Sequence, residues 1–141
     1  MAAVKTEVFK LESDSCHLKP LREKLRPLIV SAGFTEKDVE SLLVAIGEAV
    51  TNAIRHSYLG RTGNEIQVTF EESPEKVVFR IRDFGEKIKL SEVKEPVLPP
   101  VKGGGLGIYF MKTIMDELEY NTAHAQGNEL IMAKFKQGKK S

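Results

Sequence analysis

The sequence predicts a single α+β domain over residues 1–141, a two-layer sandwich in which helices cover one face of a mixed, mostly antiparallel sheet. Hydrophobic periodicity gives the element order strand, helix, helix, strand, strand, loop, helix, strand, strand. This order is not the strand–helix alternation of doubly wound parallel folds. A chain of 141 residues with 41% hydrophobic residues can build one core, and it is too short for two comfortable domains.

The N-terminal half is expected to hold one strand and two helices. Residues 4–11 mix β-branched and charged side chains and predict a strand. Residues 18–31 repeat leucines at helical spacing, and Pro27 is expected to kink or break that helix. Thr35 is expected to cap a long helix from about residue 36 to about residue 58.

The C-terminal half is expected to add strand pairs and one more helix. Residues 66–70 and 77–81 alternate with period two around a Ser-Pro turn and predict a hairpin, whereas residues 83–105 show no period. The remaining expected elements are a helix with apolar residues from Leu106 to Leu118 and strands near 119–124 and 129–135.

Composition and charge exclude several function classes. A net charge of +1 gives no electrostatic case for nucleic-acid binding. The single Cys16 rules out an internal disulfide and favours a reducing compartment. No stretch approaches the roughly 18 apolar residues of a membrane span, and residues 1–15 hold no apolar signal region. We therefore expect a cytoplasmic protein without a direct nucleic-acid or membrane partner.

A polar stripe on the long predicted helix is the first candidate site. Glu48, Asn52 and Arg55 recur at i, i+4 and i+7, which places them on one side of a regular helix. They could simply face water. However, no charge lies between Glu40 and Glu48 on that side, and asparagine is a poor residue inside a helix. A ligand is therefore the stronger interpretation. The opposite side carries a core stripe of Val39, Leu42, Leu43, Ile46, Val50, Ala53 and Ile54.

A glycine-rich run next to the last predicted helix is the second candidate. Its residues are Lys102, Gly103, Gly104, Gly105, Leu106 and Gly107. Glycines allow close approach of a ligand to the backbone, and the N–H groups at a helix start attract anions such as phosphate. The run could also be a plain hinge. It matches neither a Walker loop nor a dinucleotide fingerprint.

The third candidate is Asp83-Phe84-Gly85 at the end of a predicted strand. An acid followed by glycine after one residue is most often a turn. Alternatively, a buried carboxylate here could accept a hydrogen bond from an amino group such as that of adenine. Protein kinases contain the same three letters, but their lysine strand, glycine loop and catalytic loop are missing from this chain.

Together the three motifs resemble those of the GHKL ATPase superfamily, which includes gyrase, a heat-shock chaperone, histidine kinases and a mismatch-repair protein. The chain is most similar to the bacterial anti-sigma-factor serine/threonine kinases of partner-switching systems. The likeness covers nearly the whole chain and is strongest at residues 48–56 and 105–117. It implies a Bergerat-type ATP-binding fold with ATP and Mg as cofactors.

The resemblance also implies roles for the motif residues. Asn52 would ligate a Mg ion that bridges the phosphates, and Glu48 would orient or deprotonate an acceptor serine or threonine hydroxyl. Asp83 would bind the adenine amino group, and Gly85 would let the base approach the backbone. Residues 91–105 would form the ATP lid.

Further phosphate contacts would come from the lid and from the end of the long helix. The implied nucleotide-binding residues here are Arg55, Lys102, Gly103, Gly104, Gly105, Leu106 and Gly107. His56 would pack or lie near a phosphate. The chain departs from the family pattern at Lys87, where a second glycine is expected. It departs again at Gly127-Asn128, which replaces a Gly-Thr pair, so the threonine contact is either lost or supplied by Asn128.

The function implied is an ATP- and Mg-dependent serine/threonine kinase that phosphorylates an anti-anti-sigma (STAS) antagonist and sequesters a sigma factor.

 The resemblance thus implies a homodimer with two protein partners. Two alternatives stay open: a non-catalytic ATP-binding partner-switch module, and a stand-alone histidine-kinase-like ATPase domain.

Overall fold

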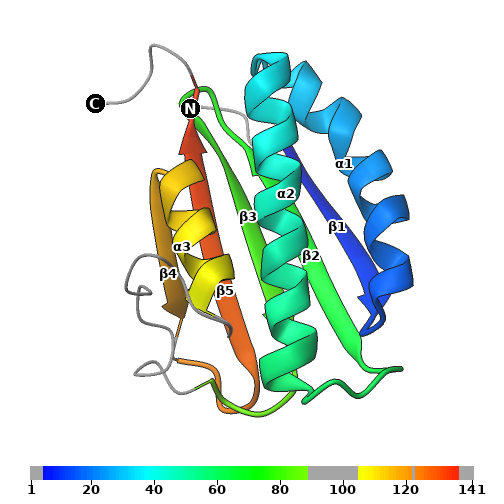
Figure 1. The fold of residues 1–141 in the computed structure, drawn as a ribbon. Coiled ribbons are helices and arrows are strands. Elements are labelled where there is room, and N and C mark those ends of the chain that lie inside the picture. Colours follow the sequence, from blue (N-terminus) through cyan, green and yellow to red (C-terminus); the bar gives the residue numbers. More distant parts are fainter. Residues whose placement is uncertain (1–4, 89–104, 122, 137–141) are drawn as a thin grey trace.

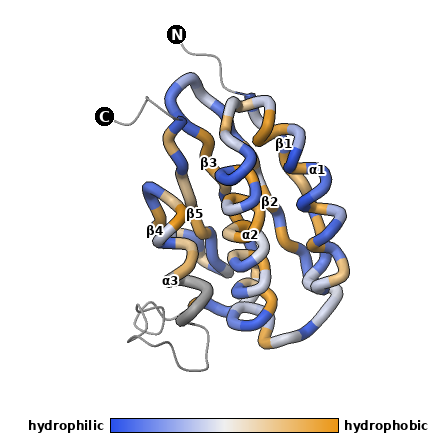
Figure 2. The backbone as a smooth tube through the Cα atoms, turned by 45° about the horizontal axis from the view of Figure 1, so that its top comes forward, coloured by the Kyte–Doolittle hydropathy of each residue, from blue (hydrophilic) through white to orange (hydrophobic). Residues whose placement is uncertain are grey.

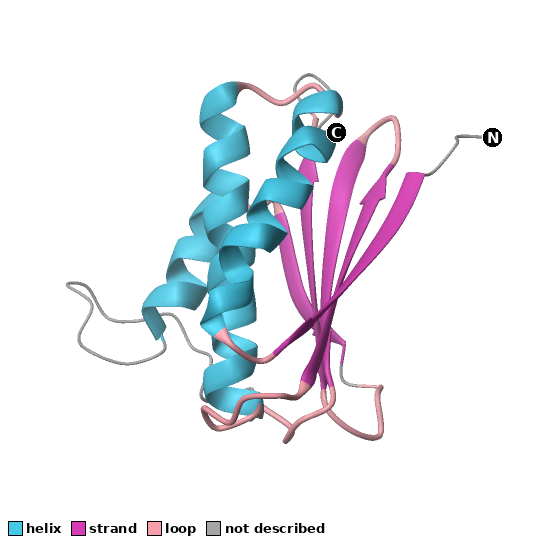
Figure 3. Cartoon of the chain, turned by 90° about the vertical axis from the view of Figure 1, so that its right-hand side faces the viewer, coloured by secondary structure: helices cyan, strands magenta, loops and turns pink. Residues whose placement is uncertain are grey.

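The computed structural model describes residues 5–88, 105–121 and 123–136. These residues form two layers, with helices on one face of a five-stranded sheet (Figures 1 and 3). The α+β architecture and the order of the elements are those expected from the sequence. Within the described residues, no helix is both long enough and apolar enough to cross a membrane.

The sheet has the strand order β1-β2-β3-β5-β4, and each neighbouring pair is antiparallel. The sequence predicts a mixed, mostly antiparallel sheet. The antiparallel pairing is confirmed, but the described strands include no parallel pair. The strands are β1 (Lys5–Glu12), β2 (Glu65–Glu72), β3 (Lys76–Asp83), β4 (Glu117–Asn121) and β5 (Asn128–Phe135).

The first two helices cover β1, β2 and β3. They are α1 (Leu18–Ser31), preceded by the short 3₁₀ turn η1 (Ser15–His17), and α2 (Glu36–Asn52), which continues into the π-helix η2 (Ala53–Ser57). The Thr35 hydroxyl accepts a hydrogen bond from the Asp38 backbone N–H at 3.2 Å, so the predicted cap is confirmed. The predicted break at Pro27 is wrong, because α1 continues through it. Pro27 and Glu23 are both exposed, so water can reach the carbonyl that Pro27 leaves without a donor.

The last helix, α3 (Gly105–Ile114), is shorter than the sequence predicts. Leu118 was expected on this helix, but it lies on β4, which begins at Glu117. The Asp116 backbone N–H donates to the Ala133 carbonyl of β5 at 2.9 Å, so sheet pairing takes over directly after the helix. Strand pairing with β5 outweighs the helical spacing of the apolar residues.

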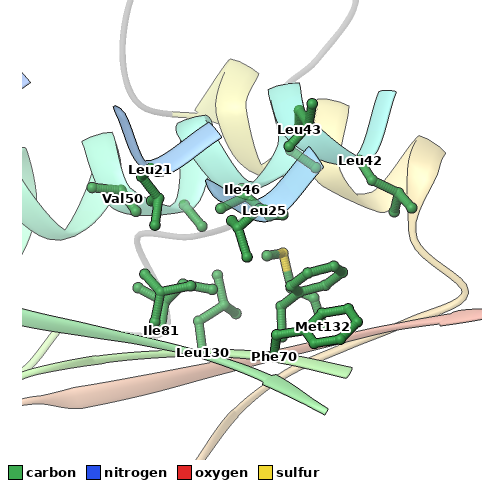
Figure 4. Packing of buried hydrophobic residues seen from close by; sticks show 14 of the residues in the cluster. Leu21, Leu25, Leu42, Leu43, Ile46, Val50, Phe70, Ile81, Leu130 and Met132 are labelled. Atoms are coloured by element: carbon green, nitrogen blue, oxygen red, sulfur yellow. The ribbon is translucent and has the colours of Figure 1, made fainter. Parts of the chain in front are cut away.

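The core fills the space between the layers. Figure 2 shows hydrophobic residues interleaved with polar ones along strands and helices, as expected for elements with one buried face. The rings of Phe70 and Phe79 meet at a centroid distance of 5.7 Å. Figure 4 shows the interdigitated side chains, which include Leu21 and Leu25 of α1, Leu42, Leu43, Ile46 and Val50 of α2, and Phe70, Ile81, Leu130 and Met132 of the sheet.

One edge of the molecule gathers the ends that carry the predicted motifs. The C-terminal end of α2, the end of β3, the start of β5 and the start of α3 all lie at the lower edge in Figure 1. Asp83 and Asn128 are direct partners in the β3–β5 register. The fold therefore brings residues from distant parts of the sequence together at this edge.

Candidate functional site

Asp83 is the centre of the site. Its side chain is buried, with 2% of its surface exposed, at the last position of β3. Oδ2 accepts a hydrogen bond from the Ser57 hydroxyl at 2.9 Å. Oδ1 accepts from the Gly85 backbone N–H and from Asn128 Nδ2, both at 3.1 Å. Asp83 is thus a buried acceptor held from three directions.

Burial and hydrogen bonding act against each other on this carboxylate. Desolvation is the larger effect and raises the pKa of Asp83 above its ordinary value. The donors at Gly85, Asn128 and Ser57 favour the ionised form and limit that rise. Among the described residues, Ser57 is the single donor to Oδ2.

Gly85 lets the chain that follows β3 pass very close to the backbone at the end of η2. A Cβ on Gly85 would lie 2.4 Å from the Ser57 carbonyl oxygen, which is too close for any other residue without a shift of the backbone. The next residue uses the same carbonyl, since the Glu86 backbone N–H donates to it at 2.8 Å. The chain at Gly85 therefore packs directly against the Ser57 carbonyl and the Tyr58 ring.

Asn128 links Asp83 to the segment that follows it. Its Nδ2 lies 2.9 Å from the Ser57 hydroxyl and 2.8 Å from the Glu86 carbonyl oxygen, and its Oδ1 accepts from the Ile88 backbone N–H at 2.8 Å. Only 6% of its surface is exposed. The structure therefore brings Asn128 into direct contact with Asp83.

Asn52 and Glu48 lie on α2 in different surroundings. Asn52 is 5% exposed, and its amide makes no hydrogen bond to any residue that the structure describes. Glu48 is half-buried beside an open depression of about 410 Å³ that α1 and α2 form together. The depression is lined by Leu18, Arg22, Val44, Gly47, Glu48 and Thr51.

Arg55 does not share the surroundings of Asn52, although the sequence predicts one stripe for both. Arg55 is exposed, as is His56. The reason lies in η2, where the Tyr58 backbone N–H donates to the Ala53 carbonyl five residues earlier. A π-helical turn holds more residues than an α-helical one, so positions after Asn52 rotate away from the expected stripe.

The glycine-rich candidate is described only in part. Lys102, Gly103, Gly104 and the rest of the expected lid before residue 105 lie outside the described residues. Gly105, Leu106 and Gly107 form the first turn of α3. α3 packs beside α2, and both its start and the end of α2 face the same edge as Asp83 (Figure 1).

Sequence reasoning missed three residues around Asp83. Ser57 donates to it, and the Tyr58 hydroxyl accepts from the Phe84 backbone N–H at 2.7 Å. Tyr120 of β4 lies near enough for the charge of Asp83, together with burial, to raise the pKa of the tyrosine to about 12. The only signal in the sequence was that Ser57 and Tyr58 directly follow the polar helix motif.

The residues present fit a Mg ion that is bound mainly through phosphate oxygens. The described part of the chain contains no group of three or more His, Cys, Asp or Glu side chains that could hold a metal alone. Mg in nucleotide sites typically takes one or two protein oxygens and several substrate oxygens or waters. The buried Asn52 amide, without a described partner, can supply such an oxygen.

Comparison with known proteins gives one family. The family described as histidine kinase-like ATPase domain matches residues 11–134. The serine-protein kinase RsbW of Oceanobacillus iheyensis is 31% identical over 111 residues, which cover 73% of this chain and 69% of that protein. RsbW of Listeria innocua is 29% identical over 122 residues, covering 81% and 76% of the two chains.

A solved structure has the same fold. The crystal structure of the RsbU and RsbW domains of Rv1364c from Mycobacterium tuberculosis matches with a TM-score of 0.65 at 18% identity. The match covers 93% of this chain and 32% of the other, so this chain spans about a third of that protein. The chain therefore belongs to the histidine kinase-like ATPase family and, within it, to the family of the serine-protein kinase RsbW.

Proposed function

We propose that this protein is an anti-sigma-factor serine/threonine kinase. It binds ATP with Mg, phosphorylates a serine or threonine of an anti-anti-sigma (STAS) antagonist, and sequesters a sigma factor. The buried carboxylate of Asp83, whose Oδ2 receives a single described donor, is the observation that carries the nucleotide part. The names of the RsbW relatives support the serine-kinase part.

Asp83 recognises the adenine base. An ionised carboxylate offers acceptor positions only, and Oδ2 receives a single described donor, from Ser57. The exocyclic amino group of adenine supplies the matching donor. Gly85 is needed for the packing of this wall of the site, because any side chain there would collide with the Ser57 carbonyl.

Asn52 holds the metal that accompanies the phosphates. Its amide oxygen is the protein ligand, since the side chain is buried and has no described partner. The bound Mg supplies positive charge that offsets the charge developing on the transferred phosphoryl group. The N–H groups in the first turn of α3, at Gly105 and Gly107, face the same edge and add an electropositive helix start. Lys102, Gly103, Gly104 and Leu106 complete the proposed phosphate contacts.

Glu48 acts on the acceptor. It stands one turn before Asn52 on α2, and its half-buried carboxylate borders the open depression between α1 and α2. An acceptor hydroxyl that enters from this side can give its proton to Glu48 as its oxygen attacks the γ-phosphorus. The bond from that phosphorus to the β,γ-bridging oxygen breaks, and ADP leaves with the bonding electrons. Pure nucleotide binding would need Asn52 and Asp83 but no carboxylate at this position.

The proposed cellular role is a choice between two partners. A phosphate on the antagonist adds negative charge and removes packing at the contact surface, which releases the kinase for the sigma factor. The whole chain is proposed to act as one kinase domain, in a homodimer in the cytoplasm.

The test is phosphate transfer to a STAS-domain antagonist encoded in the same genome, using ATP labelled on the γ-phosphate. We expect acid-stable phosphoserine or phosphothreonine, and its loss with Glu48→Gln although that variant still binds ATP. Acid-labile phosphohistidine would favour a histidine-kinase-like activity instead. ATP binding without transfer to any antagonist would leave a nucleotide-dependent binding module and overturn the kinase assignment.

A further inference from the structure

The hydrogen-bond donors around Asp83 leave little room for a ligand donor. A carboxylate has about four acceptor positions, two on each oxygen. On Oδ1 both are used, by the Gly85 N–H and by Asn128 Nδ2. On Oδ2 one is used, by the Ser57 hydroxyl. Among the described residues, a single acceptor position on Oδ2 stays open.

The directions of these donors are fixed by a chain of further bonds. Asn128 Oδ1 accepts from the Ile88 backbone N–H, so its Nδ2 faces the other way. There its two protons are shared by three acceptors: Asp83 Oδ1, the Ser57 hydroxyl and the Glu86 carbonyl oxygen. The Ser57 hydroxyl accepts from that Nδ2 at 2.9 Å, which commits its one proton to Asp83. Both Ser57 and Asn128 are buried, so water does not compete for these bonds.

We propose that Ser57 and Asn128 are positioning residues that set the base specificity of the site. By donating to Asp83, they hold its carboxylate as an acceptor with one open position, which selects a purine with an amino group at C6 over one with a carbonyl there. This inference rests on the proposed nucleotide-binding function and goes beyond it, because it assigns discrimination to two residues that do not transfer phosphate.

The physical basis is the mismatch between two acceptors. A C6 carbonyl, as in inosine triphosphate (ITP), would face the carboxylate oxygen with no proton between them. Sites built around a buried hydrogen bond reject ligands that leave it unpaired by factors on the order of 10⁴. The rejection requires Asp83 to stay ionised, since a protonated carboxyl could donate to the carbonyl.

Other groups around Asp83 do not replace the two donors. The Arg82 guanidinium is directed to backbone, donating to the carbonyl oxygens of Asp83 and Asn128. Tyr58 and Tyr120 face the site from the end of α2 and from β4, and the negative charge of Asp83 raises the pKa of each tyrosine in addition to the larger effect of burial. Loss of the Ser57 or Asn128 donor therefore shifts Asp83 toward the protonated form.

The experiment measures the affinities for ATP–Mg and ITP–Mg by calorimetry, from mildly acidic to neutral pH, on wild type, Ser57→Ala and Asn128→Ala. We expect wild type to prefer ATP strongly. Each variant should lower the ATP-to-ITP preference by at least about tenfold. The loss of preference should grow as the pH falls, because a protonated Asp83 carboxyl can donate to the C6 carbonyl oxygen of ITP.

Ser13→Ala is the matched control. Ser13 is also a fully buried serine, and its hydroxyl donates to the Arg61 carbonyl at 2.7 Å and accepts from the Asn64 backbone N–H at 3.0 Å. It has no bond to Asp83, so Ser13→Ala should lower thermal stability without changing the ATP-to-ITP preference.

Two results would overturn the inference while nucleotide binding stands. One is a wild type that binds ATP and ITP equally. The other is that Ser57→Ala and Asn128→Ala weaken both nucleotides by the same factor at every pH, which a merely structural role predicts. A wild type that binds neither nucleotide overturns the proposed function together with this inference.

Discussion

At the scale of single residues, the buried Asp83 places binding and stability in conflict. Its carboxylate loses most of its hydration at 2% exposure, and desolvation raises its pKa in the folded protein. A raised pKa for an acid means that the folded state binds the proton more tightly than the unfolded state. Stability is then lost as the pH rises from the ordinary value through the folded pKa, and above it the loss is complete.

Asp83→Asn should therefore stabilise the protein without ligand at neutral pH and abolish ATP binding. The amide oxygen can replace Oδ1 as the acceptor for Gly85 and Asn128. The amide nitrogen can donate to the Ser57 hydroxyl in place of accepting from it, and no buried charge remains. Thermal unfolding of both proteins across pH tests this. The difference in melting temperature should shrink as the pH falls through the folded pKa of Asp83. A variant that is less stable than wild type at neutral pH contradicts the expectation.

Gly127 should be among the positions most sensitive to a single methyl group. It has φ +75°, and an added Cβ would lie 2.1 Å from the backbone oxygen of Asp83. Gly63 has a similar φ of +82° but open space around it. We expect Gly63→Ala to cost about 1 kcal/mol of unfolding free energy and Gly127→Ala at least about 3 kcal/mol. Urea unfolding measures both, and equal costs would mean that the close approach to Asp83 is not rigid.

Residue-scale prediction from the sequence depended on how far apart the partners lie along the chain. Glu48, Asn52 and Asp83 stand out because their residue types are unusual at their positions in predicted elements. Ser57 does not, since its meaning comes from Asp83, 26 residues away, and from Asn128, 71 residues away. Only the register of β3 and β5 with the end of α2 brings the three together.

At the scale of elements, the start of α2 shows a cap that the sequence already indicates. The Thr35 hydroxyl accepts from the Asp38 N–H, one of the helix-start donors without a partner in the helix. Thr35→Ala should lower the unfolding free energy by about 1 kcal/mol. Thr62→Ala is the control, because Thr62 is exposed and its hydroxyl has no hydrogen bond to the described residues. Equal effects in chemical denaturation would argue against the cap.

The end of the same helix was harder to predict. Apolar spacing indicates a helix to about residue 58, and the helical segment does reach Ser57, but as the π-helix η2 after Asn52. Periodicity assumes a constant turn and cannot show where it widens. The same assumption carried the predicted third helix to Leu118, where pairing of β4 with β5 had already begun.

At the scale of the whole molecule, the sequence predicted the layers and the element order because each element carries its own period. It could not predict the edge at which α2, β3, β5 and α3 meet, since that depends on the strand order β1-β2-β3-β5-β4. In this order β5 inserts between β3 and β4, and Asn128 becomes the partner of Asp83.

The Glu48→Gln variant should separate ATP binding from phosphate transfer to the antagonist. Glu48→Gln keeps the shape of the side chain and removes its proton acceptor, so ATP affinity should stay close to wild type. Phosphate transfer to the antagonist should fall about 10²- to 10⁴-fold, the usual contribution of a general base. Single-turnover transfer with saturating ATP measures this, and an unchanged rate would remove Glu48 from the chemistry. Val44→Ala, at an exposed position beside the same depression, is the control for altered partner docking.

Calorimetry of ATP binding with and without Mg tests most directly whether the edge at the end of α2 and β3 binds ATP with Mg. We expect wild type to bind ATP more tightly with Mg, Asn52→Ala to lose that Mg dependence, and Asp83→Asn to lose ATP binding although its fold is intact. If wild type binds no ATP with or without Mg, or if both variants bind as wild type does, then the site at the end of α2 and β3 is not a nucleotide site.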